Sequence, residues 1–161
     1  MPMSATPNPA TEVDIDRASA TPAPDDATLT AWARAALDAL ALTGVSLAVR
    51  LVDAEEAQAL NRDYRGKDYV PNVLSFPLDD DFPLPPGEAR PLGDIVLCLP
   101  VIAAEAAEYG KTFEARLAHL LIHGILHLAG HAHAEEPERL AMEALETAIM
   151  ARLGFPAPYD G

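Results

Sequence analysis

The chain has 161 residues, a single cysteine and a formal net charge of −14, from 11 Lys+Arg against 25 Asp+Glu. This length suits one domain with its own core, and a lone cysteine excludes an intrachain disulfide. Cys98 lies in an apolar run, so we expect a buried, inert thiol and a reducing compartment. The first residues lack the basic start and apolar stretch of a secretion signal, and we therefore expect a cytoplasmic protein.

Hydrophobic periodicity predicts strands and helices that alternate along the chain. Residues 1–11 are predicted to be a flexible tail, ahead of a single domain at 12–161. The expected strands are 12–16, 45–52, 72–76 and 92–99; the expected helices are 28–42, 54–64, 101–109, 112–129 and 135–153. A loop rich in proline and aspartate is expected at 79–91. Interleaved strands and helices with a helical C-terminal half predict an α/β or α+β fold.

The acidic net charge is unfavourable for a nucleic-acid partner, because phosphate recognition ordinarily uses a basic surface. The charges are unevenly distributed, however, and Arg62, Arg65 and Lys67 fall within six residues. A local basic patch on an acidic body and an ordinary solvated helix end both fit this cluster.

All five histidines fall between positions 119 and 133. The stretch 117–134 lacks Asp, Glu, Lys and Arg and is nearly long enough to span a bilayer, but five ionisable rings argue against a membrane span. His123 and His127 are four residues apart, so on a helix their rings project from one face. Gly130 permits a sharp exit from the helix, after which His133 can fold back to the same point. Three neutral imidazoles leave one tetrahedral position open, which is typical of a catalytic zinc site.

The alternative is that these histidines merely cluster on a helix surface or in a core. His119 lies one turn before His123, where orienting a ligand, contacting substrate and simple packing all remain open. Zinc proteases with the H-E-x-x-H motif carry their general base directly after the first histidine, and here that position is Gly124. The spacing is therefore that of a protease, but the base of a protease is missing.

The histidine block resembles the motif H-G-x-x-H-L-x-G-x-D-H of the YbeY family of bacterial endoribonucleases. Four further blocks resemble the same family in the same order, at 60–68, 72–77, 92–95 and 143–146. The resemblance implies an α+β fold in which helices pack on a small mixed β-sheet, with a zinc site at the end of a central helix. It also implies that His123, His127 and His133 hold one zinc ion per chain.

The resemblance further implies cleavage of single-stranded RNA in ribosomal RNA processing, including maturation of the 3′ end of the small-subunit RNA, and in ribosome quality control. The implied partners are ribosomal RNA and components of the small ribosomal subunit, without a membrane or DNA. Arg65 matches an arginine tied to activity in the family, and a guanidinium near a metal suits a phosphate. The predicted catalytic residues are accordingly Arg65 and His123.

Two positions depart from the family pattern. Ala132 stands where the family usually has an aspartate, so a carboxylate that orients a ligand is missing unless Glu135 or Glu136 supplies it. Val70-Pro71 precedes Asn72 where the family usually has Pro-Thr, which removes a hydroxyl. Two other functions remain open: a non-catalytic ribosome assembly factor stabilised by zinc, and a metallopeptidase, which only the histidine spacing favours.

Overall fold

The computed structural model describes residues 10–78, 83–85, 87–131 and 135–159. Within these residues the chain forms four strands and five helices. The strands are β1 (Glu12–Ala18), β2 (Val45–Val52), β3 (Val73–Pro77) and β4 (Arg90–Cys98). The helices are α1 (Asp26–Ala39), α2 (Ala54–Arg65), α3 (Leu99–Glu108), α4 (Phe113–Leu128) and α5 (Glu136–Arg152). Every predicted helix and strand is found, and all but the strand at 45–52 have shifted ends. Most of the predicted tail, residues 1–9, lies outside the described residues, and the domain limits stay a prediction.

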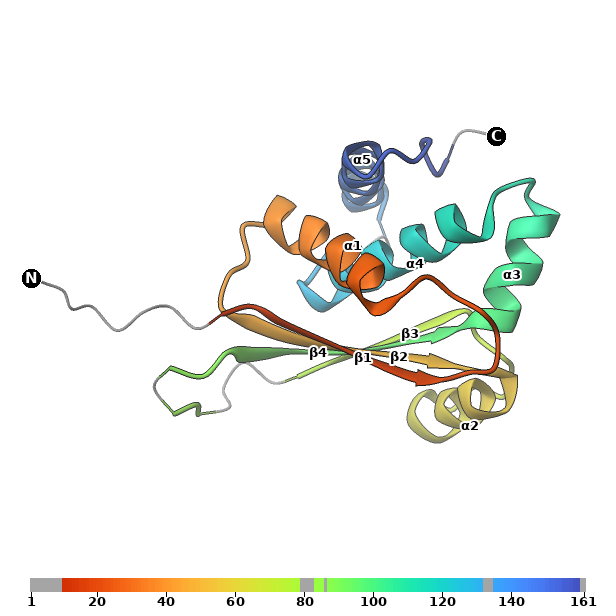
Figure 1. Ribbon diagram of the computed structural model, residues 1–161, viewed down its shortest axis with the longest axis horizontal. Helices are drawn as coiled ribbons and strands as arrows, with labels where there is room; N and C mark the ends of the chain where they lie inside the picture. Colours follow the sequence, from red (N-terminus) through yellow and green to blue (C-terminus); the bar gives the residue numbers. More distant parts are fainter. Residues whose placement is uncertain (1–9, 79–82, 86, 132–134, 160–161) are drawn as a thin grey trace, which may run out of the picture.

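The sheet is mixed, with the strand order β1-β2-β4-β3. The pairs β1/β2 and β2/β4 are parallel, whereas β3 runs antiparallel to β4. Helices α1, α4 and α5 lie over one face of this sheet and α2 lies on the other (Figure 1). A mixed sheet covered by helices confirms the α+β fold class. None of the described helices combines the length and apolarity needed to cross a bilayer.

Alternation along the strands explains the two layers of the core, because successive side chains of a strand point to opposite faces. Leu47, Val49 and Leu51 of β2 are buried in the large cluster that includes α1 and α4. Val52 and Val96 belong instead to a smaller cluster with Ala57 of α2. The sheet is therefore buried on both faces where α2 covers it.

Helix α4 approaches the sheet closely because residue 124 is glycine. A Cβ at Gly124 would lie 3.2 Å from Ile95 side-chain carbons and from the Ser75 hydroxyl oxygen. The Ser75 hydroxyl also donates to the Gly124 carbonyl at 3.3 Å. The histidine-bearing half of α4 is thus held against β3 and β4, and the position that carries the base in zinc proteases faces the sheet.

Candidate active site

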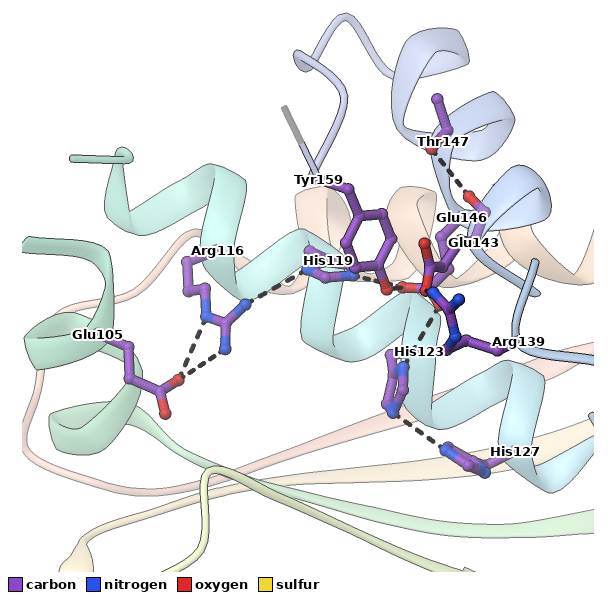
Figure 2. Close-up of polar contacts among 10 residues, drawn as sticks. All are labelled: Glu105, Arg116, His119, His123, His127, Arg139, Glu143, Glu146, Thr147 and Tyr159. Atoms are coloured by element: carbon purple, nitrogen blue, oxygen red, sulfur yellow. Dashed lines mark hydrogen bonds and ion pairs between the residues drawn. The ribbon is translucent and has the colours of Figure 1, made fainter. Parts of the chain in front are cut away.

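The predicted metal-binding face of α4 carries two imidazoles one helical turn apart. The Nε2 atoms of His123 and His127 lie 3.0 Å from each other (Figure 2). Zinc–nitrogen bonds of about 2.0–2.1 Å at a tetrahedral angle separate two ligand nitrogens by roughly 3.3 Å. The observed separation is within a few tenths of an ångström of that value, so these two donors fit a zinc ion.

The end of α4 turns in the way that the histidine spacing requires. Gly130 has φ 95°. Its N–H donates to the His127 carbonyl, and the N–H of His131 donates to the Leu126 carbonyl, each at 3.0 Å. These two bonds form a Schellman motif, which ends a helix on a left-handed residue. The predicted third ligand, His133, lies outside the described residues, and no group of three potential metal ligands is found within them.

A cleft of about 650 Å³ brings the predicted catalytic arginine to the histidine pair. Arg65, His123 and His127 all line it. Arg65 is the last residue of α2 and is exposed, and Gly66 follows it in a left-handed conformation. Arg62 and Lys67 are not among the residues that line the cleft. Arg65 therefore shares one cleft with the two predicted zinc ligands that the structure describes. The other two basic residues of its cluster do not contribute to this cleft.

Residues 69–72, directly before β3, form one wall of this cleft. Asn61 is fully buried on α2 and donates to the Tyr69 carbonyl at 3.0 Å, which anchors this segment to the helix. Pro71, at one of the positions that departs from the family pattern, is buried and lines the cleft. Asn72 then pairs its amide with Glu105 of α3 at 3.2 Å. Through these contacts the wall is tied to both α2 and α3.

A chain of polar side chains runs from Glu105 through Arg116 and His119 to Glu146 (Figure 2). Glu105 accepts from the Arg116 guanidinium at 2.9 Å, and both side chains are largely buried. The Nη1 atom of Arg116 donates to Nδ1 of His119 at 3.4 Å. His119 is 7% exposed, so of its three open roles, direct contact with substrate fits the structure least.

Glu146 of α5 contacts two of the histidines, and sequence reasoning did not single it out as a site residue. Glu146 is 1% exposed. Its carboxylate accepts hydrogen bonds from Nε2 of His119, from the Tyr159 hydroxyl at 2.9 Å and, at a longer 3.5 Å, from Nδ1 of His123. Burial alone would raise the pKa of Glu146, but the hydrogen bonds from His119 and His123 outweigh it and hold the pKa at about 2. The only sequence signal was that Glu146 belongs to a block resembling the family.

The carboxylate expected near the start of the last helix is not the one that reaches His123. Glu136 is exposed and pairs with Arg139 at 3.6 Å, and Glu135 is exposed as well. Ala132, the other departure from the family pattern, lies outside the described residues. Within the described part of the chain, the carboxylate beside a predicted ligand therefore comes from Glu146, nearly three turns further along α5.

Comparison with known proteins identifies the family. The model of the family described as "Endoribonuclease YbeY" matches residues 14–154. Endoribonuclease YbeY of Pseudomonas putida (strain W619) is 48% identical over 153 residues, which is 92% of each chain. The protein of the same name from Stenotrophomonas maltophilia (strain R551-3) is 53% identical over 131 residues, 81% of each chain.

The fold also resembles a solved structure, the solution structure of the Thermotoga maritima protein TM1509. The TM-score is 0.58 at 23% sequence identity, with 92% of this chain and 99% of that chain covered. This likeness concerns the fold alone. The family model spans most of the chain, including the α2 arginine and the two α4 histidines that line the cleft, and the chain belongs to the YbeY endoribonuclease family.

Proposed function

We propose that this protein is a zinc-dependent endoribonuclease that cleaves single-stranded RNA during ribosomal RNA processing. The observation that carries the proposal is the cleft that Arg65 shares with His123 and His127, whose Nε2 atoms lie 3.0 Å apart. The names of its relatives, each an endoribonuclease, support RNA as the substrate. Maturation of the small-subunit RNA 3′ end, ribosome quality control, small-subunit partners and a cytoplasmic location belong to the same proposal.

The chemistry follows from the donor set and the cleft. His123 and His127 would hold the zinc ion through Nε2, with His133 as the third ligand. When bound, zinc supplies Lewis acidity that stabilises charge developing on a phosphoryl group. Arg65 lines the same cleft and adds a positive charge and paired donors, which suit a phosphate diester. The attacking group is water or the RNA 2′-hydroxyl, and the end groups of the product distinguish them.

Two observations weigh against a metallopeptidase. Gly124 faces Ile95 and Ser75 on the sheet, so that position offers no base to the metal. Glu146 lies on the Nδ1 side of His123, not on the Nε2 side that faces His127. A peptidase base would have to come from elsewhere in the chain.

The test is cleavage of a single-stranded RNA that spans the 3′ end of the small-subunit precursor. We expect zinc-loaded protein to cleave it, and chelator-treated protein to regain cleavage when zinc is restored. Casein serves as the peptidase substrate and should stay intact. Intact RNA together with unfolding on zinc removal would instead favour the non-catalytic assembly factor.

A further inference from the structure

Glu146 is a buried carboxylate for which the proposed chemistry has no direct use. A charge with 1% exposure is costly unless other groups hydrogen-bond to it, and three side chains do so here. The Oε2 atom of Glu146 accepts hydrogen bonds from His119 and Tyr159, and its Oε1 atom faces His123. The tyrosine keeps its proton, because desolvation and the nearby carboxylate both raise the pKa of Tyr159. Toward the ionised carboxylate its hydroxyl is therefore the donor.

The proton on His119 is placed by Arg116. A guanidinium has donors and no acceptor, so the His119 Nδ1 atom that faces Arg116 must accept. The ring proton is then on Nε2, which donates to Glu146. Glu105 in turn holds the guanidinium at 2.9 Å. His119 is thus a fixed donor that holds one oxygen of the carboxylate in place.

The same reasoning assigns the proton on His123. An ionised carboxylate only accepts, so the His123 Nδ1 atom facing Glu146 carries the ring proton. Nε2 is then left with its lone pair directed at His127. A neutral imidazole binds zinc through the nitrogen that lacks the proton, and the hydrogen bond at the other nitrogen decides which one that is.

We propose that Glu146 is a positioning residue that holds His123 as the Nδ1–H tautomer and so presents Nε2 to the zinc ion. This inference rests on the proposed function, because it takes zinc as the metal. It also assigns a carboxylate on α5 to the orienting task that the sequence suggested for the loop around Ala132. His119 and Tyr159 contribute by fixing the second oxygen of Glu146.

Glu143 offers a matched control on the same helix. It lies three residues before Glu146, and its carboxylate pairs with Arg139 at 2.8 Å instead of with a histidine. Glu143→Gln and Glu146→Gln therefore make the same chemical change in α5. They differ in whether a predicted zinc ligand loses its carboxylate acceptor.

The first measurement needs no variant and no zinc. Nitrogen-15 NMR of the histidine side chains at about pH 8 reports which ring nitrogen carries the proton. We expect Nδ1–H for His123 and Nε2–H for His119 in the zinc-free wild type. An Nε2–H tautomer at His123 overturns the proposal, and this holds even if Glu146→Gln fails to fold.

The second measurement is zinc affinity by competition with a chelator. Loss of a partner that orients a ligand typically costs about 10- to 100-fold in metal affinity, so we expect that loss in Glu146→Gln and less than about twofold in Glu143→Gln. Glu146→Gln with wild-type affinity overturns the proposal. Wild-type protein that takes up no zinc overturns both this inference and the proposed metal site, whereas zinc uptake without RNA cleavage overturns only the proposed function.

Discussion

Replacing Arg65 by alanine tests whether the cleft binds a phosphate group of the RNA. Two unit charges about 4 Å apart attract by roughly 1 kcal/mol in bulk water and by roughly 4 kcal/mol at the effective dielectric of a protein surface. Arg65 is exposed at the end of α2, which puts its contribution in the lower part of this range. A loss of about 1.4–2.7 kcal/mol corresponds to cleavage that is roughly 10- to 100-fold slower.

The assay is cleavage of single-stranded RNA by zinc-loaded protein, with zinc content and melting temperature measured in parallel. Neither of these should change, because Arg65 is exposed and is not a predicted ligand. Arg62→Ala is the control, since it removes the same charge from the same helix outside the cleft, and its effect should stay below about threefold. Equal losses in both variants would mean that general charge matters, and unfolding of Arg65→Ala would mean that the arginine is structural.

Three further predictions follow from the same structure. His127→Ala should weaken zinc binding by more than about a hundredfold, because losing a ligand costs more affinity than losing a residue that orients one. Near-normal affinity in competition with a chelator would refute the role of His127 as a ligand. Leu121→Ala should lower the free energy of unfolding by about 2–5 kcal/mol, because Leu121 is 0% exposed. Leu140→Ala is the control, because Leu140 is 53% exposed, and its free energy of unfolding should stay within about 0.5 kcal/mol of wild type. Urea titration of both variants measures the two changes. The Cys98 thiol should react with a disulfide reagent only in denaturant, since burial raises its pKa and excludes the reagent; rapid labelling of native protein would contradict this.

The sequence by itself was sufficient for the features that depend on local geometry. Two histidines four residues apart share a helix face in any α-helix, so the pairing of His123 with His127 followed from spacing. The exit of the chain at Gly130 followed from the tolerance of glycine for positive φ. The strand at 45–52 followed from alternation and was found with the same ends.

Tertiary structure decided which distant residues meet. The sequence offered Glu135 or Glu136 as the carboxylate near a ligand histidine, whereas the packing of α5 against α4 places Glu146 beside His123 and leaves the other two exposed. The insertion of β4 between β2 and β3 likewise depends on long-range strand pairing.

Arg65 illustrates the same limit. Its motif suggested activity, but only the fold of the segment from Arg65 to β3 brings it into a cleft with residues about sixty positions further along the chain. Periodicity and capping are local properties, whereas such contacts depend on how whole elements pack, which no window of sequence contains. The sequence alone therefore determined the elements and the histidine pair, and packing alone determined which other residues surround that pair.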